Sequence, residues 1–505
     1  MPKILLAGEW VDHPLGSPTF HAFNPSTGQA IEREFAVTSG PQLQEMAAAG
    51  AEAAQALEKT DPSRIGDFLE AYATNIEQRQ DEICAAAHEE TGLPLETRLK
   101  VIEFGRMTSQ LRQAAIAARD VSPTSWRHPI IDEGTNIRSG LGALGGAVFV
   151  IDPNNFPLAF NAISGGDFAA AIAAGNPVIA KGHPAHPETS RLLAECARAA
   201  VEHVGLHPAT VQFFNHCAPE DGCALLEHSS VSALGFTGSR TAGLALKAVA
   251  DAAGKPAYLE MSSVNPVFFL PGAVKERGDD IGGDWAASVM MGGGQFCTKP
   301  GLGFAVGDDA RVLAESVCRR FADAPTHVLF TESLVGEMEH GIEAMKASGA
   351  EVVCGGNPTD EPGFRWPSTL LRVDGDTFES NFEVLSQERF GPAALIVELK
   401  DLEQGIRIAQ RLEGQLTATI YPGEGDEEAF EGLALPLRTR CGRFIQDKMP
   451  TGVAVVASMV HGGPYPATGH PGFTAVGLPT SVGRFAMRRC FDGFDAERLP
   501  MWLRG

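Results

Sequence analysis

Short apolar runs alternate with amphipathic stretches from about Gly142 onward. A run such as residues 231–237 has the length and bulk of a buried strand, and the stretch after it carries apolar residues at helical spacing. Strands that alternate with helices predict a parallel, doubly wound sheet, which is a nucleotide-binding architecture. The expected elements include a helix over residues 160–174 and a strand over residues 267–270.

The same alternation resumes around Asp280 and predicts a second α/β domain, with a helix over residues 281–291 near its start. The first part of the chain is different. Residues 1–40 predict short strands joined by Pro and Gly turns, and residues 42–119 predict a run of amphipathic helices. Residues 126–139 are polar and lack a helical stripe, which favours a projecting hairpin.

The composition is that of a globular protein, with 505 residues, 44% of them hydrophobic, and it predicts two or three domains. The net charge of -23 argues against nucleic acid and anionic membranes as partners, because both require basic patches. The nine cysteines are scattered without a Cys-x-x-Cys pair, so we expect reduced thiols and no metal site. The apolar runs are too short for a signal peptide or a membrane span, and we expect a cytoplasmic location.

One segment, residues 292–301, reads Gly-Gly-Gly-Gln-Phe-Cys-Thr-Lys-Pro-Gly. Glycines let a substrate approach the main chain closely. A thiolate is a strong nucleophile, and its pKa falls beside positive charge or a helix N-terminus. By itself, the segment fits a nucleophilic Cys297 and a buried structural Cys297 equally well.

Several strand ends carry polar residues. Asn155 follows a buried strand, where its amide can donate to an oxyanion, although an Asn-rich turn explains it as well. Lys181 ends the next strand at the edge where nucleotides bind. Residues 236–239 (Phe-Thr-Gly-Ser) join a strand to a helix N-terminus that suits a pyrophosphate, without the common glycine fingerprint.

Two carboxylates complete the candidate chemistry. Glu260 ends an apolar strand, and burial there is expected to raise its pKa toward that of a general base. Glu388 precedes a tight turn and, taken alone, fits an exposed loop residue.

In this order and context the segments resemble the aldehyde dehydrogenase superfamily over nearly the whole chain. The matching motifs are Pro-x-Asn-Phe-Pro (153–157), Lys181, Phe-Thr-Gly-Ser (236–239), Leu-Glu-Met (259–261), Gly-Gln-x-Cys (294–297) and Glu-x-Phe-Gly-Pro (388–392). The resemblance implies an α/β fold with a Rossmann-like cofactor domain, a second α/β catalytic domain and a small oligomerisation element. The expected segments are 1–120 (N-terminal strands and helices of the cofactor domain), 121–140 (oligomerisation hairpin), 141–272 (NAD(P)-binding domain), 273–460 (catalytic domain) and 461–505 (C-terminal return and oligomerisation tail).

The resemblance also implies roles for individual residues. Cys297 would attack an aldehyde as a thiolate, Asn155 and the Cys297 backbone N–H would stabilise the oxyanion, and Glu260 would activate the water that hydrolyses the thioester. Lys181 would contact the adenosine ribose or a 2′-phosphate. Ser239 would contact the pyrophosphate, and Glu388 would contact the nicotinamide ribose. The expected cofactor-binding set is Lys181, His183, Pro184, Phe236, Thr237, Gly238, Ser239, Glu388 and Phe390.

Two positions depart from the commonest pattern of the superfamily. Asn154 stands where tryptophan is usual, and Pro184 stands where many NAD-dependent members have a glutamate. A glutamate would repel a 2′-phosphate, so its absence, together with Lys181 and His183, favours NADP with NAD tolerated. The alternative is that His183 is simply a loop residue.

Residues 181–187, 295–301 and 462–468 resemble the α-ketoglutarate semialdehyde (2,5-dioxopentanoate) dehydrogenase branch. This branch implies an aldehyde substrate that carries a carboxylate, and a homodimer or homotetramer. The sequence does not identify the residue that binds the carboxylate: His461 is one candidate, and Arg240 is disfavoured because it opens the nucleotide-binding helix. Three alternatives stay open. The enzyme could oxidise another semialdehyde or an aliphatic aldehyde, or it could be a CoA-acylating enzyme, although Glu260 disfavours this. The chain could also be a catalytically silent nucleotide-binding scaffold.

Overall fold

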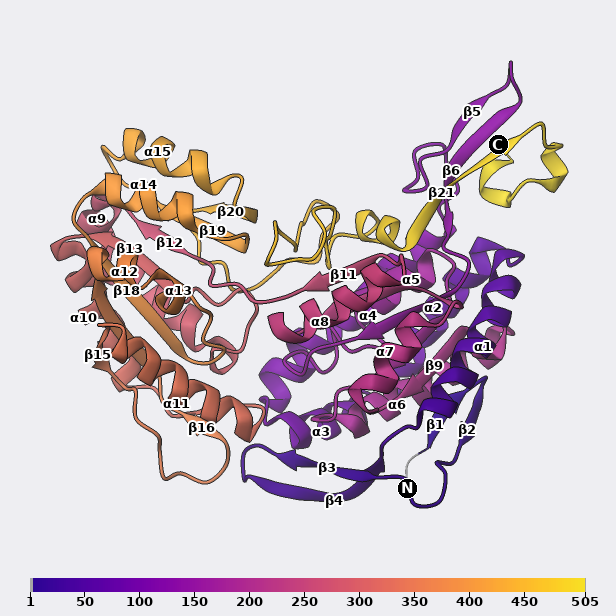
Figure 1. The fold of residues 1–505 in the computed structure, drawn as a ribbon, viewed down its shortest axis with the longest axis horizontal. Helices are drawn as coiled ribbons and strands as arrows, with labels where there is room; N and C mark the ends of the chain where they lie inside the picture. Colours follow the sequence, from indigo (N-terminus) through magenta and orange to yellow (C-terminus); the bar gives the residue numbers. More distant parts are fainter. Residues whose placement is uncertain (1–2, 505) are drawn as a thin grey trace.

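The computed structural model describes residues 3–504, and Figure 1 shows two α/β halves and a projecting arm. Each half contains a seven-stranded sheet. The predicted α/β fold class is confirmed. Met1, Pro2 and Gly505, at the ends of the predicted first and last segments, lie outside the described residues.

The first sheet contains five parallel strands and an antiparallel edge. In spatial order its strands are β11 (Ala257–Glu260), β10 (Val231–Thr237), β7 (Ala147–Ile151), β8 (Val178–Lys181), β9 (Val211–Phe214), β1 (Ile4–Leu6) and β2 (Glu9–Val11). The strand order reverses at β7, since β8 and β9 lie on one side and β10 and β11 on the other. Doubly wound sheets bind ligands beside the carboxyl ends of their strands at such a point.

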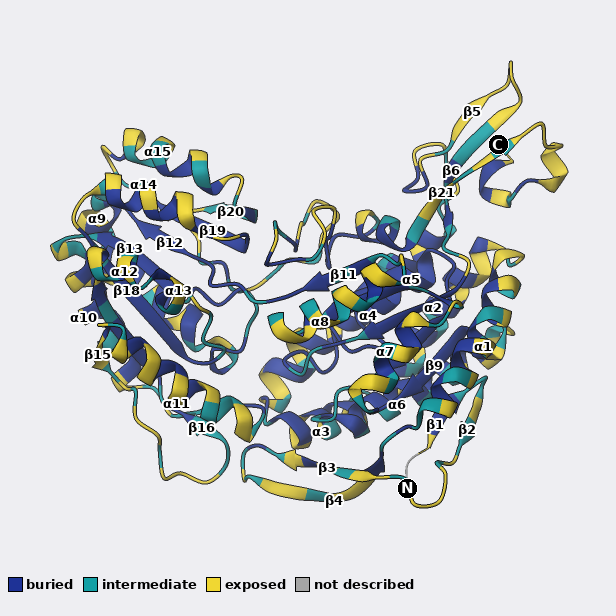
Figure 2. Cartoon of the chain, in the orientation of Figure 1, coloured by how far each residue is buried: buried dark blue, intermediate teal, exposed yellow. Residues whose placement is uncertain are grey.

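The side chains of β7 show how the sheet is buried. Val148 and Val150 pack into one hydrophobic cluster, and Ala147 and Phe149 pack into another on the opposite face. Figure 2 shows these strands buried beneath helices whose outer faces are exposed. One face is covered by α2 (Pro62–Glu77), α3 (Gln80–Thr91), α4 (Gly105–Arg119), α5 (Gly166–Ala173) and α6 (Pro187–Val204), and the other by α1 (Gly40–Glu58), α7 (Pro219–Glu227) and α8 (Arg240–Ala252).

The second sheet repeats this layered arrangement. Its order is β15 (Glu351–Cys354), β17 (Thr369–Asp374), β18 (Ala393–Leu399), β13 (Leu302–Val306), β12 (Val267–Phe269), β19 (Gln415–Tyr421) and β20 (Cys441–Gln446). The helices α9 (Pro271–Met290) and α10 (Asp308–Ala322) pack on one face. The other face carries α11 (Glu332–Ala347), α12 (Gly375–Ser380), α13 (Phe382–Leu385), α14 (Leu402–Arg411) and α15 (Glu427–Leu437).

The projecting arm contains a hairpin that overlaps the predicted one, and it adds a third strand from the end of the chain (Figure 1). It is built from β5 (Ile130–Asp132), β6 (Ile137–Ala143) and β21 (Ala486–Asp492). Its role in oligomerisation stays a prediction. Two further short sheets are β3 (Thr19–Asn24) with β4 (Gln29–Ala36), and β14 (His327–Val328) with β16 (Arg365–Trp366).

Three predicted elements differ from the structure. The helix expected over residues 160–174 begins only at Gly166, because the Asn161 side chain bonds the Pro157 carbonyl and the Ile163 backbone N–H and holds the preceding turn. The helix expected over residues 281–291 begins already at Pro271 and is kinked at Arg277. Strand β12 belongs to the second sheet, so the first sheet ends before the expected boundary at residue 272. A fully apolar strand gives no sign of which sheet it joins.

One cysteine pair also departs from expectation. Cys318 on α10 and Cys354 on β15 form a disulfide, so the prediction of nine reduced thiols is wrong for this pair. The two residues are 36 positions apart and meet because α10 packs against the end of the sheet. Sequence spacing alone therefore could not identify the bond.

Candidate active site

All twelve predicted site residues line one cavity of about 870 Å³, to which both halves of the chain contribute. Its volume lies in the range of ligand sites. The residues from the first half follow the carboxyl ends of β7, β8, β10 and β11, at the point where the strand order reverses. The lining includes Asn155, Lys181, His183, Pro184, Phe236, Thr237, Gly238, Ser239, Glu260, Cys297, Glu388 and Phe390.

The second half supplies two loops to the cavity. Cys297 precedes β13 and Glu388 precedes β18, and these strands are parallel neighbours, so both loops lie at the same sheet edge. The buried Lys299 ties the loops together, because its Nζ donates to the carbonyl oxygens of Arg389 (2.7 Å) and Ala393 (2.8 Å). Burial raises the pKa of Glu388 and lowers that of Lys299.

The glycine run before Cys297 has a specific packing role. Gly294 has a φ of 70°, and a Cβ atom at this position would lie 2.1 Å from the carbonyl oxygen of Gly391. Only glycine fits this conformation and this close approach. The run therefore lets the nucleophile loop pack directly on the Glu388 loop.

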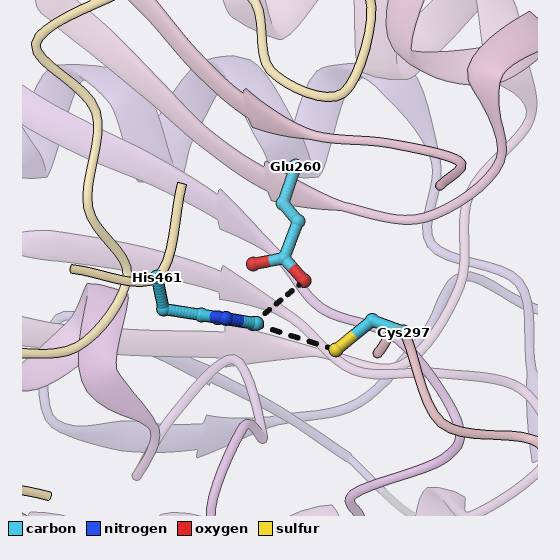
Figure 3. Close-up of side chains that lie close together, drawn as sticks. All are labelled: Glu260, Cys297 and His461. Atoms are coloured by element: carbon cyan, nitrogen blue, oxygen red, sulfur yellow. Dashed lines mark hydrogen bonds and ion pairs between the residues drawn. The ribbon is translucent and has the colours of Figure 1, made fainter. Parts of the chain in front are cut away.

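Cys297 and Glu260, which line the cavity, meet the side chain of His461 (Figure 3). The Nε2 atom of His461 lies 3.4 Å from the Cys297 Sγ and 3.1 Å from the Glu260 Oε1. The His461 and Glu260 side chains are each only 2% exposed. The imidazole can therefore exchange a proton with the thiol or the carboxylate. The three ligand-type atoms lie within 4.8 Å of one another, close enough to share a metal ion.

The environment of Cys297 keeps its thiol protonated at neutral pH. Burial raises the pKa of Cys297 well above its usual range, and the charge of Glu260 and a hydrogen bond with it raise this pKa further. The Arg106 guanidinium acts in the opposite direction. A thiol in this state needs a base to become a nucleophile, and His461 and Glu260 are both in place.

This raised pKa predicts how Cys297 reacts with iodoacetamide in the free protein. Only the thiolate reacts, so the alkylation rate is expected to rise about tenfold per pH unit from neutral to alkaline pH, without a plateau near neutrality. Mass spectrometry of the peptide that contains Cys297 measures this rate. A plateau already reached at neutral pH would contradict the assignment.

Glu260 differs from the expectation of a raised pKa. Burial alone would raise the pKa of Glu260, but the positive charge of His461, its hydrogen bond and a hydrogen bond from Cys297 outweigh burial and lower it. The carboxylate is therefore ionised at neutral pH, which is the state that a general base requires. Its Oε2 is buried and has no partner among the described residues.

Asn155 is held beside the nucleophile loop. Its Nδ2 donates to the carbonyl oxygen of Gln295 at 2.9 Å, and the residue is buried. A primary amide has a second N–H, which this bond leaves free. The position fits a donor to an oxyanion on a group bound at Cys297.

The far part of the cavity fits a dinucleotide. Ser239 caps α8, accepting from the Ala242 backbone N–H at 3.3 Å, so the other first-turn amides face the cavity end of the helix. Burial lowers the pKa of Lys181, and burial with the neighbouring His186 and Lys181 lowers that of His183 well below its usual range. His183 is therefore neutral at neutral pH and contributes a hydrogen bond, not a charge.

His461 was anticipated only as one candidate for the substrate carboxylate, whereas the structure places it against Cys297. It comes from an irregular segment, and its backbone N–H donates to Thr474 Oγ1 while Ala475 N–H donates to its carbonyl. Arg106 was not anticipated at all. The sequence shows only a charged residue within a stretch predicted to form amphipathic helices, and such a residue more often lies on the solvent-exposed face.

The chain has two α/β halves, and a cysteine, a glutamate and an asparagine line the cavity to which both contribute. This combination is typical of nucleotide-dependent oxidoreductases. The sequence profile of the Aldehyde dehydrogenase family matches residues 10–431, and the chain belongs to this family. Its enzyme class follows: members act on small aldehydes with a nicotinamide nucleotide cofactor. The resemblance inferred from the motifs is thereby confirmed.

Two curated relatives are similar over nearly their whole length. The Alpha-ketoglutaric semialdehyde dehydrogenase 2 of Azospirillum brasilense is 35% identical, covering 99% of this chain and 96% of that protein. The Alpha-ketoglutaric semialdehyde dehydrogenase of Acinetobacter baylyi is 32% identical, covering 97% of this chain and 93% of that protein.

Solved structures show the same fold. The NAD+ complex of an aldehyde dehydrogenase from Bacillus cereus has a TM-score of 0.83 at 18% identity, covering 97% of this chain and 96% of that one. A Pseudomonas syringae Aldehyde Dehydrogenase C mutant complexed with NAD+ and octanal has a TM-score of 0.82 at 21% identity, covering 98% and 97%. Among residues 3–504, no helix is long and apolar enough to cross a membrane.

Proposed function

We propose that this aldehyde dehydrogenase oxidises α-ketoglutarate semialdehyde to 2-oxoglutarate through a thioester on Cys297. The observation that carries the substrate assignment is the identity of 35% and 32%, over nearly the full length, to two relatives named for this aldehyde. The site supports the chemistry, because a nucleophile, a base and an oxyanion donor line one cavity.

In the first half of the proposed reaction, the Cys297 sulfur attacks the aldehyde carbon. The thiol proton passes to the ionised Glu260, or to His461 after the imidazole has given its Nε2 proton to Glu260, since Nε2 contacts both Sγ and the carboxylate. The aldehyde oxygen becomes an oxyanion and accepts hydrogen bonds from Asn155 Nδ2 and the Cys297 backbone N–H. The nicotinamide cofactor, when bound, supplies the hydride acceptor of the reaction.

In the second half, a Cys297 thioester must be hydrolysed. Glu260 is the proposed base, because its carboxylate is buried, ionised and free at Oε2 to accept a proton from water. His461 holds the other carboxylate oxygen at 3.1 Å. Release of the carboxylate product restores the Cys297 thiol.

The cavity supports NADP as the preferred cofactor, with NAD tolerated. Lys181, His183 and Pro184 lie together on the lining, and none of them is a carboxylate that would repel a 2′-phosphate. The Lys181 Nζ donates only to the adjacent Gly182 carbonyl, at 3.3 Å, among the described residues. Because His183 is neutral, the preference is expected to depend on Lys181.

Pro184→Glu tests this preference. The new carboxylate is expected to lower kcat/KM for NADP by about 10-fold or more relative to NAD, because it places a negative charge beside the phosphate. Initial rates with each cofactor measure the ratio. Pro184→Gln is the matched control of equal size without charge, and an equal change in both variants would contradict the electrostatic argument.

The substrate assignment is tested by initial rates of reduced-cofactor formation with α-ketoglutarate semialdehyde, succinate semialdehyde and propanal. We expect the highest kcat/KM with α-ketoglutarate semialdehyde. Comparable values on all three aldehydes would exclude the substrate assignment while leaving the enzyme class intact. Turnover that requires CoA would instead identify an acylating enzyme.

A further inference from the structure

Arg106 is partly buried, and its guanidinium has no hydrogen-bond or ion-pair partner among residues 3–504. Its Nε and Nη2 atoms are both shielded from solvent and unpaired. The residue lies at the start of α4, directly after a π-helical segment (Leu95–Phe104). Burial lowers the pKa of Arg106. A shielded cation without a partner is unfavourable, so this position calls for an anionic ligand.

Two neighbouring charged residues, Arg98 and Glu103, are already engaged with each other. Arg98 Nη1 pairs with the buried Glu103 at 2.5 Å. The other oxygen of Glu103 accepts from the backbone N–H groups of Leu158 (2.8 Å) and Ala159 (3.1 Å). Glu103 is therefore satisfied on both oxygens and does not pair with Arg106.

A second arginine near the thiol, Arg443, provides a contrast. Its guanidinium donates to the backbone carbonyl oxygens of Gly452, at 3.2 Å, and Pro450. Those bonds fix the local chain and occupy both terminal nitrogens. Of these three arginines, Arg106 is the one that makes no hydrogen bond or ion pair among the described residues.

A single aromatic ring, that of Phe160, connects Arg106 to His461. Its guanidinium carbon is 4.7 Å from the centre of the Phe160 ring and 5.5 Å from that of Phe156. The Phe160 ring centre is 6.3 Å from that of His461, whose Nε2 contacts the Cys297 Sγ. The Arg106 charge lowers the pKa of both Cys297 and Glu260.

We propose that Arg106 binds the carboxylate of the aldehyde substrate, with Phe156 and Phe160 as the apolar walls between this subsite and Cys297. The inference rests on the proposed function. In α-ketoglutarate semialdehyde the aldehyde and carboxylate carbons are four carbon–carbon bonds apart, about 5 Å when extended. A guanidinium binds a carboxylate through two parallel hydrogen bonds, and the phenylalanine faces suit the intervening methylene groups.

The test compares the wild-type enzyme with Arg106→Met on α-ketoglutarate semialdehyde and on pentanal, which has the same number of carbons and no charge. We expect kcat/KM on the semialdehyde to fall about 10- to 100-fold, mainly through KM, with pentanal unchanged or improved. Arg106→Lys should retain part of the preference. Arg443→Met is the control, because it removes a positive charge near the thiol and should not change the ratio between the two aldehydes.

A direct binding measurement separates this inference from the proposed function. The dissociation constant of 2-oxoglutarate is measured by calorimetric titration of the cofactor-bound protein. It should be at least about 10-fold higher for Arg106→Met than for the wild type. Equal affinity for both proteins, or an equal loss of kcat/KM on both aldehydes, would overturn the role of Arg106. If wild type prefers pentanal and still binds 2-oxoglutarate through Arg106, the substrate assignment fails and the carboxylate subsite stands.

Discussion

Replacement of Cys297 by alanine is expected to lower aldehyde oxidation by at least about 10⁴-fold, because the proposed reaction requires a covalent bond to Sγ. Cys297 is the one cysteine among the described residues that line the cavity. Neither Glu260 nor His461 can form the thioester in its place. The measurement is the initial rate of reduced-cofactor formation at saturating aldehyde.

The variant must be shown to be folded for the result to count. Cofactor binding should persist, because Lys181, Ser239 and the α8 terminus do not touch Sγ, and the unfolding temperature should stay near that of the wild type. Cys490→Ala is the matched control, since Cys490 is exposed on β21, and it should retain full activity. Substantial aldehyde oxidation by the Cys297→Ala variant would show that Cys297 is a structural residue and not the nucleophile.

Much of this site was predictable because parallel strands end at a common edge. Asn155 follows one strand, and Lys181 and Glu260 end two others. Because these strands are parallel, their carboxyl ends place the three side chains at one edge of the sheet. The strand over residues 231–237 has the predicted bounds because Ser230 precedes its apolar run and Gly238 follows it. The contents of the cavity thus follow from local pattern and topology.

Other features depend on packing that no local pattern encodes. His461 reaches Cys297 from 164 residues away, through an irregular segment with no periodicity to orient it. Arg106 becomes a candidate only when Glu103 is seen to be satisfied elsewhere. The lowered pKa of Glu260 was mispredicted for the same reason, because the strand predicts burial but not the opposing charge of His461.

Replacement of Glu260 by glutamine is expected to separate the two halves of the reaction. Attack by Cys297 and hydride loss do not consume the carboxylate, so a rapid first turnover should remain if His461 takes the thiol proton. Hydrolysis of the thioester should slow about 10²- to 10⁴-fold, because the base is lost. A burst of reduced cofactor followed by a slow steady rate, with the acyl group detected on Cys297 by mass spectrometry, is the expected result.

The shape of the kinetics decides which buried group serves which step. Loss of the burst together with the steady rate would mean that Glu260 also activates the thiol. An unchanged steady rate would transfer the hydrolytic role to His461, and His461→Asn should then accumulate the thioester instead. In wild type the lowered pKa keeps Glu260 ionised above the ordinary carboxyl range, so the hydrolysis rate should not decline until the pH falls below that range. A decline that begins well above the ordinary carboxyl range would exclude Glu260 as the base, and the contact of His461 with both Cys297 and Glu260 would then assign that role to the imidazole.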